Sequence, residues 1–169
     1  MGQALRLAGT VAESIVDGPG IRYVVFTQGC PHHCPGCQNP ETHDFTGGYE
    51  ASPDALLEEI RRNRLVSGVT FSGGEPFAQA AALLPIAQAL HEEGKHLMAY
   101  TGYTFEELLE SQEEAVRALL GTLTLLVDGR FELSQRSLEL RFRGSANQRV
   151  LDVQRSLAQG TAAWAEGYQ

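Results

Sequence analysis

The chain is poor in the features that mark membrane-bound, secreted and nucleic-acid-binding proteins. Its 169 residues contain no apolar run of about 20 residues, the length needed to span a membrane. Residues 1–10 lack the apolar core of a signal peptide. Lys and Arg number only 13 against 21 Asp and Glu, which argues against non-specific binding to DNA or RNA. We therefore expect a cytoplasmic protein with no membrane and no nucleic acid among its partners.

Internal repeats, low-complexity tracts and linkers are also missing. A chain of this length can bury one hydrophobic core without disulfide or metal staples. We expect residues 1–169 to form a single domain.

Cysteine is scarce and confined to one place. The chain has 3 cysteines, and all of them lie in one loop, at Cys30, Cys34 and Cys37. Their odd number and crowding argue against disulfides and for a reducing compartment. A C-x3-C-x2-C run with no fourth cysteine suits an iron–sulfur cluster in which one iron stays open. An open coordination position usually indicates chemistry rather than a structural role.

A structural zinc site is the alternative interpretation of this loop. His32, His33 or His43 would complete a tetrahedron with the three thiolates. Zinc modules usually pair two C-x2-C knuckles, and only Cys34 and Cys37 have that spacing, so we favour the cluster. His32 and His33 are then expected behind the ligands or in solvent.

Strand and helix patterns alternate along the chain. Runs rich in β-branched and aromatic residues predict strands, and apolar residues at helical spacing predict the helices between them. The expected strands cover 5–11, 21–27, 68–71, 96–100 and 123–127, and the expected helices cover 53–63, 78–91, a segment from 105, and 113–120. We also expect an edge strand over 138–143 and a last helix from about Ser145. This alternation predicts an α/β fold with a mainly parallel sheet.

Four unusual loops each follow a predicted strand. They are the cysteine loop and the turns at 72–76, 101–104 and 128–130. Because sites in parallel α/β folds lie beyond the carboxyl ends of the strands, we expect these loops to converge on one catalytic site.

Each of the other motifs also has a plain structural interpretation. The glycines before Glu75 either admit a ligand to the backbone or form a tight turn with Glu75 in the first helical turn. The Asp-Gly-Arg stretch at 128–130 is either a hairpin turn or a site element in which Arg130 neutralises a carboxylate. The stretch 143–148 suits an anion or a nucleoside, or is only a helix cap at Ser145.

These motifs resemble a known enzyme superfamily. The C-x3-C-x2-C loop, followed by a strand that ends in Gly-Gly-Glu, is similar to the radical S-adenosylmethionine (SAM) superfamily. Within it, the Asp-Gly-Pro-Gly turn at 17–20 resembles the activases of glycyl radical enzymes. The stretches that resemble the activating proteins of anaerobic ribonucleoside-triphosphate reductases are 34–39, 100–103, 126–131 and 143–148.

The resemblance implies a cofactor set. A [4Fe-4S] cluster would be bound by Cys30, Cys34 and Cys37, and its open iron would be chelated by the amino and carboxylate groups of SAM. The methionine amino group would be held by Gly73, Gly74 and Glu75. The fold implied is an incomplete (β/α)6 barrel, a single radical SAM domain open on one side to a protein substrate.

The resemblance also implies further contacts. Asp128 and Arg130 take the place of an Asp-x-Lys element of the family and would contact SAM, although Arg keeps the charge of Lys and not its geometry. The turn that would face the incoming protein substrate contains Asp17, Gly18 and Gly20.

The activity implied is reductive cleavage of SAM to a 5′-deoxyadenosyl radical, which takes a hydrogen from a glycine of the partner. That partner would be the large subunit of an anaerobic ribonucleoside-triphosphate reductase, and the electron would come from a flavodoxin-like donor. The protein would supply positioning and exclusion of water, with no catalytic residue beyond the cluster and SAM. The alternatives are a radical SAM enzyme acting on another glycyl radical enzyme or a small molecule, and a non-catalytic zinc or iron–sulfur module.

Overall fold

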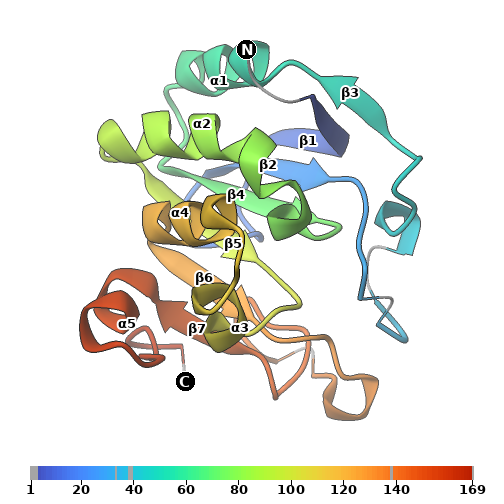
Figure 1. Ribbon diagram of the computed structural model, residues 1–169, viewed down its shortest axis with the longest axis vertical. Helices are drawn as coiled ribbons and strands as arrows, with labels where there is room; N and C mark the ends of the chain where they lie inside the picture. Colours follow the sequence, from blue (N-terminus) through green and yellow to red (C-terminus); the bar gives the residue numbers. More distant parts are fainter. Residues whose placement is uncertain (1–3, 33, 38–39, 138, 169) are drawn as a thin grey trace.

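The computed structural model describes residues 4–32, 34–37, 40–137 and 139–168. Within them a single sheet forms the centre of the fold (Figure 1), in the order β3-β1-β2-β4-β5-β6-β7. The strand bounds are Leu5–Ser14 (β1), Arg22–Thr27 (β2), Tyr49–Ala51 (β3), Gly68–Gly73 (β4), His96–Tyr100 (β5), Leu125–Asp128 (β6) and Arg149–Asp152 (β7).

The middle of the sheet is parallel. Strands β2, β4, β5 and β6 pair in parallel, whereas β1 is antiparallel to both β2 and β3, and β7 is antiparallel to β6. Since β3 reverses the direction of β1, it runs the same way as the central strands. The prediction of an α/β fold with a mostly parallel sheet is confirmed.

Helices connect the parallel strands. Their bounds are Pro53–Arg62 (α1), Ala80–Glu92 (α2), Phe105–Leu109 (α3), Glu114–Thr122 (α4) and Val153–Gln159 (α5). Helix α1 begins as its sequence predicts, with Ser52 accepting from the Ala55 N–H and with Pro53 in the first turn. A 3-10 turn at Pro76–Gln79 precedes α2. Helices α1, α2 and α4 lie side by side over one face of the sheet (Figure 1).

The side chains of the central strands alternate between two faces. Phe71 and Ala99 belong to the main hydrophobic core, on the side of the helices. Their neighbours Ser72 and Tyr100 therefore point to the opposite face, where Tyr100 packs on a smaller cluster around Met98. One face of the sheet is thus covered by helices, and the other is available for a site.

Two predictions for the C-terminal third are wrong. Residues 139–142 form bends and Arg143 is irregular, so this segment is not an edge strand, and Leu138 lies outside the described residues. No helix begins near Ser145, which forms an isolated antiparallel bridge with Arg136; the next elements are β7 and then α5. Strand β7 forms because Val150 and Leu151 pair with β6, a contact that local alternation does not reveal. None of the helices in the described part of the chain is long and apolar enough to cross a membrane.

Candidate active site

A cavity of about 370 Å³ opens on the face of the sheet opposite the helices. All four predicted loops contribute to its lining, through Cys30, Gly73, Thr101 and Gly129 among others. These loops follow β2, β4, β5 and β6, the four parallel neighbours, so their carboxyl ends meet at one edge. The predicted convergence of the four loops is confirmed.

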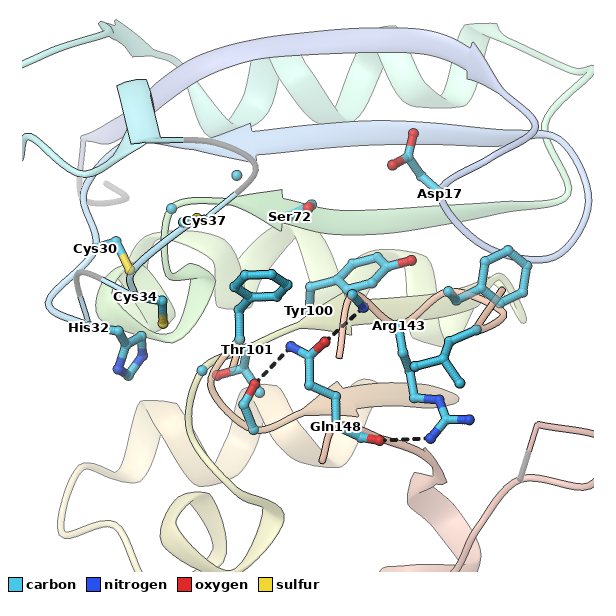
Figure 2. Close-up of a pocket in the computed structure, with 18 of the residues that line it drawn as sticks. Asp17, Cys30, His32, Cys34, Cys37, Ser72, Tyr100, Thr101, Arg143 and Gln148 are labelled. Atoms are coloured by element: carbon cyan, nitrogen blue, oxygen red, sulfur yellow. Dashed lines mark hydrogen bonds between the residues drawn. The ribbon is translucent and has the colours of Figure 1, made fainter. Parts of the chain in front are cut away.

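The three thiols gather at one end of this cavity, and Asp17 lies toward the other (Figure 2). Cys30 is buried, Cys34 and Cys37 are partly exposed, and none is in a disulfide. Among the described residues, no group of three His, Cys, Asp or Glu side chains is placed to hold a single metal ion. Three soft thiols on one loop, beside an open cavity, fit the donor set of an iron–sulfur cluster, whose ligands bind separate irons.

Backbone hydrogen bonds anchor the base of the cysteine loop. The Gly29 N–H donates to the Thr42 carbonyl at 2.6 Å, and the Cys30 N–H donates to the His43 carbonyl at 3.1 Å. The Gly29 carbonyl accepts from the Glu75 N–H at 2.8 Å. The loop is therefore joined to both the following segment and the turn after β4.

Burial raises the pKa of the Cys34 thiol above its usual value, and the nearby Arg130 opposes this shift. The thiol form is thus favoured when no metal is bound. Metal binding to this residue must displace a proton.

Glycine is required at both positions of the turn after β4. Gly73 has φ of +94°, and a Cβ there would lie 2.5 Å from the Thr27 nitrogen. A Cβ on Gly74 would lie 2.3 Å from the Gly29 carbonyl oxygen. Because these neighbours are backbone atoms, they cannot move aside cheaply. The two glycines therefore let the turn pack closely against Thr27 and Gly29, and the turn itself lines the cavity.

Glu75 does not line this cavity. Its side chain is fully buried, and its carboxylate accepts from the backbone N–H of Phe77 and Gly102 and from the Thr101 hydroxyl. His32 lies 2.6 Å away and is a further partner. This carboxylate joins the turn after β4 to the turn after β5.

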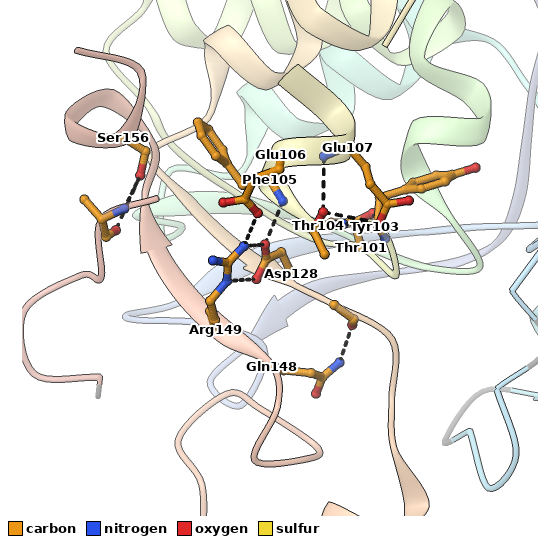
Figure 3. Close-up of polar contacts among 12 residues, drawn as sticks. Thr101, Tyr103, Thr104, Phe105, Glu106, Glu107, Asp128, Gln148, Arg149 and Ser156 are labelled. Atoms are coloured by element: carbon orange, nitrogen blue, oxygen red, sulfur yellow. Dashed lines mark hydrogen bonds and ion pairs between the residues drawn. The ribbon is translucent and has the colours of Figure 1, made fainter. Parts of the chain in front are cut away.

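Asp128 likewise does not line the cavity, and Figure 3 shows its contacts with Phe105 and Arg149. Its carboxylate accepts from the Phe105 N–H at 2.7 Å, at the start of α3, and pairs with Arg149 at 2.5 Å. The Arg149 guanidinium also pairs with Glu106 at 2.7 Å. The Asp128 carboxylate, followed by Glu106, raises the pKa of Arg149 above its usual value. Asp128 therefore ties the end of β6 to α3 and β7.

Sequence reasoning missed Arg149. The residue faces Asp128 across the β6–β7 pair, so predicting the ion pair required predicting β7 and its register. Arg130 is also outside the residues that line the cavity, and its Nε donates to His32 Nδ1 at 3.3 Å.

The stretch 143–148 braces the turn at 128–130. The Gln148 amide donates to the Gly129 carbonyl at 3.0 Å and accepts from the Gly144 N–H at 2.9 Å (Figure 2). The Asn147 amide donates to the Arg130 carbonyl at 2.8 Å. Gln148 also lines the cavity. The stretch thus fixes the shape of the cavity wall. The polar groups that it brings to this wall are side-chain amides, not the N-terminus of a helix.

Hydrogen bonds that involve the buried Arg22 stabilise the turn at 17–20. This guanidinium is 1% exposed and donates to the Pro19 carbonyl and the Thr70 hydroxyl, and that hydroxyl donates to the Asp17 carbonyl. A Cβ on Gly18 would lie 2.6 Å from the Arg22 Cδ. Gly18 and Gly20 therefore shape this turn without lining the cavity.

Two features of Asp17 concern the cavity itself. Its carboxylate lines the cavity and accepts from the Ser14 hydroxyl at 2.5 Å. Burial, helped by the nearby Asp17 charge, raises the pKa of Tyr100 above its usual range. Tyr100 is thus a neutral phenol that walls the cavity between Asp17 and the thiols.

Comparison with known proteins gives a consistent family. A model of the 4Fe-4S single cluster domain matches residues 16–151. The anaerobic ribonucleoside-triphosphate reductase-activating protein of Vibrio cholerae is 37% identical over 142 residues, which cover 79% of this chain and 89% of that protein. The protein of the same name from Escherichia coli K12 is 34% identical over 144 residues, covering 80% and 91%.

Two further similarities are more partial. The pyruvate formate-lyase-activating enzyme of Clostridium pasteurianum is 40% identical over 114 residues, covering 62% of this chain and 48% of that enzyme. The crystal structure of QueE from Escherichia coli matches with a TM-score of 0.47 and 22% identity, covering 60% of this chain and 54% of that one. The chain thus spans about half the length of each of these two proteins.

The resemblance predicted from the motifs is confirmed by these relatives, and the matching domain contains an iron–sulfur cluster. The chain belongs to the family of anaerobic ribonucleoside-triphosphate reductase-activating proteins, enzymes of the radical SAM superfamily that carry a 4Fe-4S domain.

Proposed function

We propose that this protein cleaves SAM reductively and generates a glycyl radical on the large subunit of an anaerobic ribonucleoside-triphosphate reductase. The observation that carries the proposal is the joining of three thiols and a bare Gly73–Gly74 backbone at one end of a single cavity. The names of the relatives support the choice of partner.

Each group has an assigned task in this proposal. A [4Fe-4S] cluster is held by Cys30, Cys34 and Cys37. When bound, the reduced cluster supplies the electron for SAM cleavage and hence the carbon-centred radical that takes hydrogen from glycine. The Gly73–Gly74 backbone, which lines the same cavity as the thiols, holds the methionine part of SAM.

The acidic residues divide into two classes. Glu75 and Asp128 act from behind the cavity wall, since protein donors already occupy their carboxylates. Arg130 acts beside them through His32. Among the described residues, Asp17 alone offers a carboxylate to the cavity, at the end away from the thiols, on a turn shaped by the neighbouring Gly18 and Gly20. We assign this turn to the protein substrate.

The chain's own contribution is then enclosure and alignment. A carbon-centred radical reacts with its nearest neighbour, so catalysis depends on how closely the cavity fixes the distance to the glycine. The phenol of Tyr100 and the amide of Gln148 form walls between the thiols and Asp17. We propose that the sheet is an incomplete (β/α)6 barrel, a single radical SAM domain whose uncovered face admits the glycine-bearing loop, and that the electron donor is flavodoxin-like.

The experiment is anaerobic electron paramagnetic resonance on the reconstituted protein, reduced in the presence of SAM and the reductase of the same organism. We expect a glycyl radical doublet on the reductase, and its absence with Cys34→Ala. Formation of 5′-deoxyadenosine without the doublet would keep the SAM chemistry and reject the partner. A protein that holds zinc and yields neither signal is a metal-binding module, which overturns the proposal.

A further inference from the structure

We propose that His32 and Glu75 form a latch, a buried hydrogen-bonded pair that holds the cysteine loop against the turns after β4 and β5. By fixing the middle of the loop, this pair presets where Cys30 and Cys34 point before any metal is bound. The inference rests on the proposed function only in naming the iron–sulfur cluster as the group that these thiols hold.

Burial and distance define the pair. His32 Nε2 lies 2.6 Å from Glu75 Oε1, and the two side chains are 4% and 0% exposed. His32 lies between Cys30 and Cys34 in the sequence, and it lines the cavity at the same end as these two thiols (Figure 2). The pair therefore connects the metal-binding loop to a fully buried carboxylate behind the cavity wall.

The surroundings are shaped to receive the imidazole. Its ring meets the Tyr103 ring edge-on, with centroids 4.6 Å apart and planes at 76°, a favourable aromatic geometry. A Cβ on Gly102 would lie 2.4 Å from the His32 Cδ2, so a side chain there would exclude the ring. The Thr-Gly-Tyr sequence at 101–103 thus provides a slot of the size and shape of the imidazole.

The hydrogen bonds of the ring determine which nitrogen carries the proton. Arg130 Nε donates to His32 Nδ1 at 3.3 Å, so Nδ1 presents its lone pair. Nε2 then carries the hydrogen and donates to Glu75. Both nitrogens are engaged, and the ring has one orientation that satisfies them.

Glu75 is a rigid anchor for that donor. It accepts from Phe77 N–H at 3.1 Å, from Gly102 N–H at 2.8 Å and from the Thr101 hydroxyl at 2.8 Å. These donors belong to the turns after β4 and β5. A carboxylate without access to water needs each donor, because a lost partner leaves buried charge uncompensated. The latch therefore links the cysteine loop to two of the other three loops around the cavity.

The test compares hydrogen exchange in full-length, metal-free variants by mass spectrometry. His32→Phe keeps a ring against Tyr103 and removes both nitrogens, whereas His32→Gln restores an N–H donor near the Nε2 position. The matched control is His91→Phe, on the exposed end of α2.

We expect His32→Phe to speed exchange of the amides of Gly29 and Cys30 roughly 10- to 100-fold, because the lost bond is charge-assisted. Exchange in α2 and α4 should be unchanged, and His32→Gln and His91→Phe should match the parent protein. If His32→Phe left exchange of the loop unchanged, the latch would be refuted. If His32→Phe also speeded exchange in α2, the variant would be broadly destabilised, and His32→Gln would serve as the test instead. Loop exchange like that of the parent protein in His32→Gln supports the latch. Rapid loop exchange in a folded His32→Gln protein refutes it.

A second readout uses the reconstituted protein. The rate at which a chelator bleaches the iron–sulfur absorbance should rise about tenfold in His32→Phe and return toward the parent rate in His32→Gln. If the chelator bleached the absorbance at the same rate in both variants and in the parent protein, the proposed effect of the latch on the thiols would be refuted. The metal-free exchange result stands whether or not a cluster binds, so failure of the proposed function is distinguished from failure of the latch.

Discussion

The clearest test of the site geometry is replacement of Asp128 by asparagine. The side chain is 1% exposed, and its two oxygens receive the Phe105 N–H and the Arg149 guanidinium. Asparagine has nearly the same shape but turns one acceptor into a donor. One NH2 group would then face an N–H donor, and the partly buried guanidinium would lose its counter-charge.

The expected cost follows from these contacts. Breaking a buried ion pair by removing one charge costs about 3–5 kcal/mol. Arg149 is 27% exposed, and it keeps Glu106, so solvent and the second carboxylate reduce the loss. We expect Asp128→Asn to lower the free energy of unfolding by about 3 kcal/mol, equivalent to roughly 6–12 °C in Tm for a chain of this size.

The matched control is Glu106→Gln, which contacts the same guanidinium from a side chain that is 54% exposed. An exposed partner of this kind contributes about 0.5 kcal/mol or less. Urea unfolding of both variants, without SAM, measures the two costs. The reasoning is refuted if Asp128→Asn unfolds like the parent protein and instead weakens SAM binding, because Asp128 would then be a ligand contact.

Three further predictions concern other parts of the molecule. Burial lowers the pKa of His96 to about 4, below its usual 6.5, so the unfolded chain takes up this proton first as the pH falls. The free energy of unfolding should therefore decline from pH 6.5 toward pH 4, with a slope of at most about 1.4 kcal/mol per pH unit. In a series of urea-unfolding measurements at different pH, His96→Gln should flatten this decline. If the slope were the same in the variant, other groups would be responsible for it. Gly74→Ala should lower the free energy of unfolding by about 2 kcal/mol or more, because its Cβ meets a backbone oxygen at 2.3 Å, whereas Gly121→Ala, where the Cβ meets nothing within 4 Å, should not destabilise the protein. Gln148→Ala should weaken SAM binding severalfold in a calorimetric titration, since the amide braces the cavity wall at Gly129; unchanged affinity would show that the wall holds its shape without it.

Much of the fold and part of the site follow from local patterns. Alternation of short apolar runs with amphipathic segments predicted the central strands and α1, α2 and α4, because each pattern is set within a few residues. Because these strands are parallel, the loops that follow β2, β4, β5 and β6 must meet at one edge of the sheet. The prediction of an edge strand at 138–143 was wrong because a strand also needs a neighbouring strand to pair with. Local alternation of side chains does not reveal whether such a strand is present.

The sequence by itself therefore determined which thiols are available as ligands, the order of the parallel strands' connections and the edge at which the cavity opens. Tertiary structure alone decided which polar residues face that cavity. Glu75 and His32 are 43 residues apart in the chain, and Asp128 and Arg149 are 21 apart, yet each pair is in contact. The motifs predict that Glu75 and Asp128 contact a ligand; in the fold neither residue lines the cavity, and each joins separate segments of the chain. The physical reason is that a buried carboxylate must be matched by donors, and in a folded chain those donors come from segments that only the packing brings together.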